Sequence, residues 1–142
     1  MVEPATWRDL SSLRRLEKIC FPVDVWPLLD MIGVLTFPGV VRLKATQDGE
    51  MVGFIAADIR QMENLSWIST LGVLPDYRRR GIARMLLQEC EARLQVPKVR
   101  LSVRASNQPA LRLYTSVGYQ QHTIWSRYYG DGEDALILEK SL

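Results

Sequence analysis

The fold is decided by the stretch Leu71-Gly72-Val73-Leu74-Pro75-Asp76-Tyr77-Arg78-Arg79-Arg80-Gly81-Ile82-Ala83. An apolar run from Trp67 to Leu74 ends at Pro75, which has no N–H with which to continue a strand ladder. Three arginines and Gly81 follow, and a long helical pattern then begins. A helix leaves its first N–H groups unpaired and carries partial positive charge at that end. The order of strand, basic turn, glycine and helix therefore predicts a site for a phosphorylated ligand.

Downstream of this stretch, the spacing of apolar residues predicts a helix from Gly81 to about Leu94. Pro97 ends it, and a strand is expected at Val99–Val103. A strand, a helix of this length and a second strand form a crossover unit, so the two strands should be parallel. Asn107 should begin a short helix, and Gly118 should end it. Strands at Tyr119 to about Tyr129 and at Ala135–Leu138 then complete the sheet.

Upstream, Thr6 and Asp9 have the spacing of a capping box before an amphipathic helix that runs to Cys20. A second, unusually apolar helical segment begins near Trp26. Asp48-Gly49 is a hairpin signal between strands at Val40–Ala45 and Met51–Ile59. Short links favour antiparallel pairing of these pieces. The fold class predicted from the pattern is α/β with a mixed sheet.

Length and composition limit the function. With 142 residues we expect one domain over residues 1–142. No run approaches the roughly 18 apolar residues of a membrane span, and no signal-peptide pattern precedes the first helix, so a cytoplasmic protein is expected. A formal charge of +2 is too small to indicate nucleic-acid binding. Cys20 and Cys90 lie in apolar patterns and are expected to be free buried thiols. His122 is the only histidine, so we expect no metal site.

The chain resembles the GCN5-related N-acetyltransferases, the GNAT superfamily. Arg78-Arg79-Arg80-Gly81-Ile82-Ala83 matches the family signature of Arg or Gln, two residues, Gly, one residue, and Gly or Ala, between a strand and a helix. A second match is Val103-Arg104-Ala105-Ser106-Asn107, followed by Leu113-Tyr114 and Gly118-Tyr119. The end of the chain, with Arg127-Tyr128-Tyr129, is similar to the RimI-type enzymes, which acetylate the N-terminal alanine of a ribosomal protein. The matches cover about half of the chain.

The resemblance implies a single GNAT domain. Its mixed, mostly antiparallel sheet would have about seven strands, a parallel pair splayed at its centre and about four flanking helices. It also implies acetyl-CoA as co-substrate, with direct transfer of the acetyl group to a primary amine. The pyrophosphate would lie on the turn and helix start, the pantetheine along the strand and near Asn107, and Tyr114 would protonate the leaving thiolate. The residues implied for acetyl-CoA are Leu71, Val73, Arg78, Arg79, Arg80, Gly81, Ile82, Ala83 and Asn107.

Structural interpretations of the same residues remain open. Asn107 is also the expected N-cap of its helix, since Pro109 and apolar residues follow. Tyr114 falls on the apolar stripe of that helix and could be a core aromatic. Trp26 could likewise be core. By resemblance, its region and the strand end at Tyr128 would hold the acceptor, so both are candidate substrate residues.

One departure from the RimI-type pattern concerns the general base. Those enzymes have a glutamate where this chain has Ser102, and Thr70 replaces an asparagine in the central strand. Ser102 has no useful basicity near neutral pH; Glu63 or a water held by strand backbone are the remaining candidates for the base. An α-amine has a pKa of about 8 and is partly neutral at pH 7, whereas a lysine side chain, at about 10.4, is almost fully charged.

We therefore expect the acceptor to be the α-amine of a protein or peptide N-terminus. Acetylation of a small amine, or a non-catalytic acyl-CoA-binding module, are the alternatives. Binding to nucleic acid or membrane is not expected, and the enzyme should be a monomer or homodimer.

Overall fold

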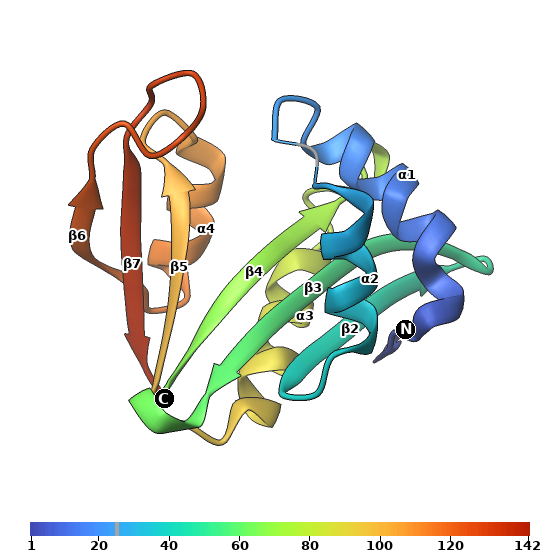
Figure 1. Cartoon of the computed structure of the whole chain (residues 1–142). Coiled ribbons are helices and arrows are strands. Elements are labelled where there is room, and N and C mark those ends of the chain that lie inside the picture. Colours follow the sequence, from blue (N-terminus) through green and yellow to red (C-terminus); the bar gives the residue numbers. More distant parts are fainter. Residues whose placement is uncertain (25) are drawn as a thin grey trace. The chain divides into compact units, whose positions relative to one another are not determined.

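The computed structural model describes residues 1–24 and 26–142. They form two compact units, one of Met1–Ile59 with Ser69–Gln95 and the other of Arg60–Ile68 with Val96–Leu142 (Figure 1). Strand β4 (Leu65–Val73) contributes its first half to the second unit and its second half to the first.

The first unit is built on an antiparallel arrangement of β1 (Val2–Pro4), β2 (Val40–Gln47) and β3 (Glu50–Arg60). The predicted hairpin joins β2 to β3, with positive φ at both Asp48 and Gly49, as a type I′ turn requires. At the end of β4, the Leu74 N–H donates to the Val52 carbonyl of β3 at 2.9 Å.

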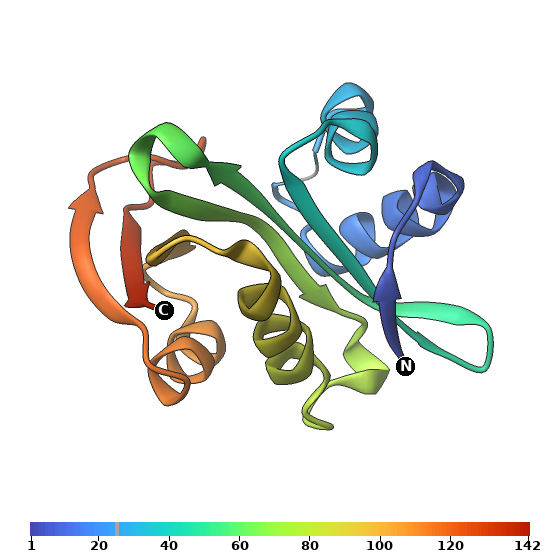
Figure 2. The same ribbon diagram turned by 90° about the horizontal axis from the view of Figure 1, so that it is seen from below.

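Helices cover both faces of β2 and β3 in this unit. Figure 2 shows α1 (Leu10–Cys20) and α2 (Leu28–Thr36) on one face and α3 (Ile82–Leu94) on the other. The predicted capping box is present: the Thr6 side chain accepts from the Arg8 N–H, and the Asp9 carboxylate accepts from the Thr6 N–H at 2.8 Å. It closes a short 3₁₀ turn, Trp7–Asp9, that leads into α1. The unit buries apolar side chains of all three helices, among them Leu13, Leu16, Met31, Leu35, Leu86, Leu87 and Leu94.

The second unit contains the parallel pair. Leu65–Trp67 of β4 pair with 98–100 of β5 (Lys98–Arg104). Strand β7 (Ala135–Ser141) runs antiparallel to β5, and β6 (Gln120–Trp125) is the outer strand beside β7. Helix α4 (Gln108–Ser116) follows β5 along the chain.

Several predicted boundaries are wrong; the last strand, β7, runs to Ser141 rather than ending at Leu138. The strand expected to reach Tyr129 ends at Trp125, because the Arg127 N–H donates to the Asp134 carboxylate at 2.9 Å and Arg127 has a φ of 52°, which closes a turn. The second helix begins at Leu28 rather than near Trp26, since Pro27 disfavours helical backbone in the residue before it.

The described residues hold seven strands in one sheet, in the order β1-β2-β3-β4-β5-β7-β6, and four α-helices. The predicted mixed α/β sheet with a parallel β4–β5 pair is confirmed. The splay of that pair and the single-domain organisation of 1–142 stay predictions. Across residues 1–24 and 26–142, every helix is too short or too polar to cross a membrane.

Candidate functional site

The basic turn has the backbone that an anion site requires. After β4 the chain makes a short 3₁₀ turn, Pro75–Tyr77, and two left-handed residues follow, Arg79 with φ 64° and Gly81 with φ 79°. Gly81 is the N-cap of α3 and has no side chain to cap the helix. A helix start capped by a glycine leaves its first N–H groups available to a ligand, and alternating backbone conformations gather such groups into a concave nest.

The three arginines of this turn are exposed, and two of them have partners within it. The Arg78 Nε donates to the Val73 carbonyl at 2.9 Å. The Arg80 guanidinium lies over the Tyr77 ring, 5.0 Å from its centroid. These contacts favour the prediction that backbone amides matter more than guanidinium groups for the phosphates.

The end of β4 is closely packed. Val73 is buried and Leu71 is half-buried. The Val73 carbonyl also accepts from the Cys20 thiol at 3.4 Å. Cys20 and Cys90 are both free, as predicted, but only Cys90 is fully buried. Burial raises the pKa of both thiols, that of Cys90 to about 12, so neither is a ready nucleophile at neutral pH.

In the second unit, Asn107 is the predicted N-cap of α4. Its side-chain oxygen accepts from the Ala110 N–H at 3.2 Å. The oxygen is thus used by the helix, while the residue as a whole is exposed and its amide NH₂ is a separate donor group. The structure supports the capping role, and a contact with the pantetheine stays a prediction.

Tyr114 lies two turns further along α4 and is 8% exposed. Its ring packs edge-on against Tyr119, with centroids 5.6 Å apart. Burial, and then the nearby Tyr129, raise the pKa of the Tyr114 hydroxyl above its ordinary value of 10. Tyr114 is therefore protonated throughout the neutral range, as a proton donor to a thiolate must be.

The three candidate substrate residues lie in different elements. Ser102 is half-buried on β5, where it pairs with Ile137 of β7. Trp26 is half-buried in the segment before α2. Tyr128 is 53% exposed, in the loop between β6 and β7. Ser102 and Tyr128 belong to the second unit, together with Asn107 and Tyr114, whereas Trp26 and the basic turn belong to the first.

Sequence reasoning missed an aromatic cluster around Tyr128. Its rings contact one another in series, with centroids 5.1–5.6 Å apart, and its members are Trp67, Trp125, Tyr128 and Tyr129. The Arg104 guanidinium lies 4.2 Å from the centroid of the Tyr129 ring. Tertiary contact between β4 and β6 creates this cluster within the second unit, so no local sequence signal announces it.

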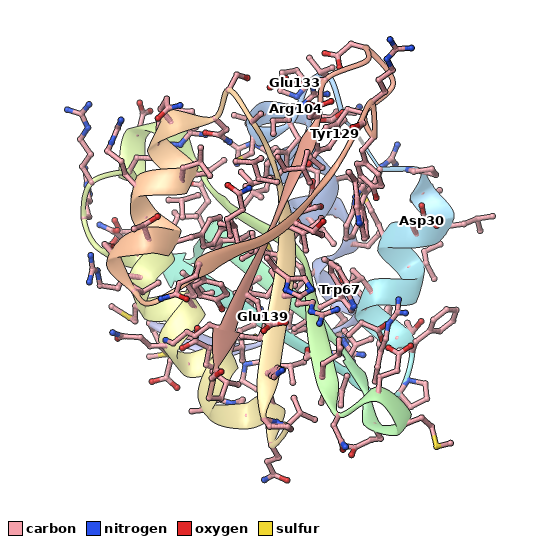
Figure 3. The ribbon with its side chains drawn as sticks, turned by 90° about the vertical axis from the view of Figure 1, so that its left-hand side faces the viewer. Asp30, Trp67, Arg104, Tyr129, Glu133 and Glu139 are labelled. Carbon is pink, nitrogen blue, oxygen red and sulfur yellow. The ribbon has the colours of Figure 1, made fainter. Side chains whose placement is uncertain are left out.

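Arg104 also holds the loop that carries Tyr128. It pairs with Asp131 at 2.9 Å and with Glu133 at 3.0 Å, and Figure 3 shows Arg104, Tyr129 and Glu133 together at one end of the sheet. Hydrogen bonds, from Arg104 to Asp131 and from Ser106 and Arg104 to Glu133, hold the pKa values of both carboxyls below their ordinary range. At neutral pH both carboxyls are therefore ionised, and their ion pairs with Arg104 hold the loop in place.

A buried carboxyl was missed as well. Glu17 is 1% exposed on α1, and its Oε1 accepts from the Thr70 hydroxyl at 2.9 Å. Burial raises the pKa of Glu17, and the hydrogen bond from Thr70 opposes this only in part. The signal was present in the sequence, because Glu17 follows Leu13 by four residues and so falls on the apolar stripe of the helix.

Within residues 1–24 and 26–142, no three His, Cys, Asp or Glu side chains are grouped so as to hold a metal ion. Residues 10–119 match the model of the acetyltransferase (GNAT) family. The chain belongs to the GNAT acetyltransferase family.

Individual acetyltransferases resemble it over most of its length. The chain is 29% identical to the NAA10 catalytic subunit of the N-terminal acetyltransferase A complex of Arabidopsis thaliana, over 99% of this chain and 77% of that protein. It is 36% identical to the ribosomal protein bS18-alanine N-acetyltransferase of Escherichia coli, over 69% of each. The crystal structure of the ribosomal-protein-S18-alanine N-acetyltransferase from Escherichia coli superposes with a TM-score of 0.88 at 29% identity, covering 99% of this chain and 92% of that one.

These similarities confirm the predicted superfamily and the resemblance to RimI-type enzymes. They also confirm the enzyme class: this GNAT acetyltransferase is an acetyl-CoA-dependent N-acetyltransferase. The roles of its individual site residues are not tested by the similarities and stay predictions.

Proposed function

We propose that this acetyltransferase transfers the acetyl group of acetyl-CoA to the α-amine of a protein or peptide N-terminus. The observation that carries the proposal is the similarity, over 99% of the chain, to a catalytic subunit named for N-terminal acetylation. The similarity to an enzyme named for the alanine of a ribosomal protein points to the same class of acceptor.

The proposed acetyl-CoA contacts come from the family resemblance, and the backbone of each unit supports them. Left-handed Arg79 and the left-handed glycine cap of α3, Gly81, present backbone N–H groups to the pyrophosphate. The pantetheine adds along the end of β4 as an extra strand would. The acetyl-CoA-binding residues that we propose are Leu71, Val73, Arg78, Arg79, Arg80, Gly81, Ile82 and Ala83 in the first unit and Asn107 in the second.

The proposed transfer is direct. The uncharged amine attacks the thioester carbonyl, a backbone amide near Val73 stabilises the oxyanion, and Tyr114 donates a proton to the departing thiolate. Tyr114 is protonated at neutral pH, as this donor role requires. Trp26, Ser102 and Tyr128 are proposed to hold the acceptor.

The nature of the acceptor agrees with the residue at position 102. Serine supplies no carboxylate, so an amine that is partly neutral near pH 7 is favoured over a lysine side chain. We further propose a cytoplasmic enzyme that acts as a monomer or homodimer, without nucleic acid or membrane.

The first prediction concerns ligand binding. Because acetyl-CoA binds only the folded chain, acetyl-CoA at 100 times its Kd should stabilise the fold by about 2.7 kcal/mol and raise Tm, as measured by scanning fluorimetry. Desulfo-CoA, which keeps the phosphates, should also raise Tm, whereas pantetheine alone should give a smaller shift. No shift at saturating acetyl-CoA would contradict the proposed site.

Thiol release in the presence of alanine-, serine- and methionine-terminated peptides, free amino acids and polyamines then tests the acceptor. Faster turnover with peptides supports the proposal. Turnover with small amines alone would overturn it.

A further inference from the structure

Glu17 is a buried carboxyl that the proposed chemistry leaves unused. Its carboxyl pairs with the neutral hydroxyl of Thr70 at 2.9 Å rather than with a cation. Burying a carboxylate without a cation is costly, and an apolar side chain on the same helix face would avoid that cost. The cost of burying this carboxyl suggests that it has a role in the chemistry.

The position of Glu17 is next to the strand that is proposed to bind acetyl-CoA. Helix α1 packs directly on β4: a Cβ built on Gly72 would lie 3.2 Å from Leu16 and 3.3 Å from the Cys20 sulfur. Cys20, one turn after Glu17, contacts the Val73 carbonyl at 3.4 Å. Glu17 and Thr70 thus belong to the same packed region as the proposed oxyanion-binding backbone.

Thr70 is the more exposed member of the pair. It is 9% exposed, compared with 1% for Glu17. Its hydroxyl hydrogen is given to Glu17, so its oxygen retains acceptor capacity. Thr70 and Glu17 are both buried, and a hydroxyl in this arrangement can accept a proton at its oxygen while it passes its own proton to the carboxylate.

We propose that Glu17 is the final proton acceptor for the acceptor amine, through Thr70, in place of the carboxylate that is absent at Ser102. This inference rests on the proposed acetyl transfer. In this proposal Thr70 contacts the acceptor amine, or a water bound to the amine. Glu17 does not contact the amine and receives its proton through the Thr70 hydroxyl.

The protons balance as follows. The ammonium nitrogen gives one proton to the Thr70 oxygen as the hydroxyl proton moves to the Glu17 carboxylate, which later returns it to solvent. The neutral nitrogen attacks the carbonyl carbon, a C–N bond forms and the C–S bond breaks. The second proton lost by nitrogen is balanced by the proton that the coenzyme A sulfur gains.

Few other charges bear on Glu17. On its own helix, Arg14, Arg15 and Lys18 are exposed, and Arg15 pairs with Glu50 at 2.6 Å. The Cys20 thiol has its pKa raised chiefly by burial and, to a lesser extent, by Glu17, while the Arg78 guanidinium lowers it. Residues 65–73 of β4 carry no charged side chain, and Asp30, the only titratable residue of α2, is exposed. The raised pKa of Glu17 brings the carboxyl closer to the working range of a base at neutral pH.

The test is Glu17→Gln, which keeps an oxygen acceptor for Thr70 but cannot take a proton. At pH 7, kcat for an N-terminal peptide should fall on the order of 100-fold, with an unchanged Kd for acetyl-CoA. The rate should recover as pH rises, because the amine itself becomes neutral. Glu89→Gln, an exposed carboxylate on α3, is the matched control and should leave kcat unchanged.

A stability readout accompanies the kinetics. Because the folded-state pKa of Glu17 is raised, its ionisation opposes folding: stability is complete below the ordinary pKa of 4.5 and is lost as pH rises through the folded-state value. Glu17→Gln should therefore raise Tm more at pH 8 than at pH 4. A fall in kcat without loss of Tm separates the proton-acceptor role from a structural one.

Variants at Thr70 complete the test. Thr70→Val should lower kcat as much as Glu17→Gln does, and the kcat of the double variant should be no lower than that of either single variant. Thr70→Ser, which keeps the hydroxyl, should retain activity. Provided that the wild type is active, either of two results would overturn the inference. One is full activity of Glu17→Gln with an unchanged pH profile, and the other is full activity of Thr70→Val. A wild type without turnover would instead overturn the proposed function.

Discussion

At the scale of single residues, Tyr114 is the proposed proton donor and is almost fully buried. A tyrosine with the ordinary pKa of about 10 is already protonated at neutral pH, and burial raises the pKa of Tyr114 further because its charged form is disfavoured inside the fold. The sequence allowed two interpretations of Tyr114, as an aromatic residue of the core or as a catalytic acid. The structure shows that it is buried, and burial is compatible with both roles.

The variant Tyr114→Phe should distinguish the catalytic role of Tyr114 from a purely structural one. Removing only the hydroxyl should lower kcat by about 10- to 100-fold, with little change in the Kd for acetyl-CoA. The pKa of Tyr114 is raised above 10, so ionisation of Tyr114 should cause no decline in wild-type kcat up to about pH 10. Stopped-flow thiol release across pH measures both effects, and a purely structural tyrosine would leave kcat unchanged.

At the scale of elements, α4 combines a structural cap with a proposed ligand contact at one residue. The Asn107 oxygen satisfies the Ala110 N–H, which would otherwise lack a partner at the helix start. The amide NH₂ is the part that a pantetheine could meet. The two functions use different atoms, so two substitutions can distinguish them.

Asn107→Ala should cost about 1 kcal/mol of stability, because it removes the cap. Asn107→Ser keeps a capping oxygen but loses the NH₂ donor, so its Tm should stay near that of the wild type. If the NH₂ contacts acetyl-CoA, both variants should show a raised KM for acetyl-CoA. An unchanged KM in Asn107→Ser would limit Asn107 to capping.

Elements with strong local signals were predictable from the sequence. The Asp48-Gly49 turn, the capping box at Thr6 and the parallel β4–β5 pair are confirmed. These signals depend on backbone conformation and spacing, which the residue types specify directly. The predicted end of β6 was wrong because the loop after it stops the strand where its residue types would continue it: Arg127 has left-handed backbone, and its N–H donates to the Asp134 carboxylate.

At the scale of the whole molecule, the residues that we propose for the chemistry are divided between the two compact units. The turn at Gly81, Glu17 and Thr70 belong to the first, and Asn107 and Tyr114 belong to the second. The sequence predicted the family and the basic turn, since both depend on short motifs. It could not predict the aromatic cluster or the Glu17–Thr70 pair, because these depend on which elements pack together.

Hydrogen exchange tests whether one ligand engages both units. Binding of acetyl-CoA should slow amide exchange at 79–84 in the first unit and at 105–111 in the second, as measured by mass spectrometry. The outer strand β6, far from the proposed contacts along the chain, serves as the internal control. Protection confined to the first unit would contradict the proposed role of Asn107.

Gly72 has a consequence for how this enzyme can change its rate. The helix that carries Glu17 lies so close to β4 that even one added carbon would meet Leu16, Phe21 and Cys20 at 3.2–3.3 Å. For an alanine at position 72, these side chains would have to give way by a few tenths of an ångström, and the proposed proton transfer from Thr70 to Glu17 depends on the separation of its donor and acceptor. If Glu17 is the proton acceptor that we propose, the size of residue 72 would therefore influence turnover through the packing of α1 on β4.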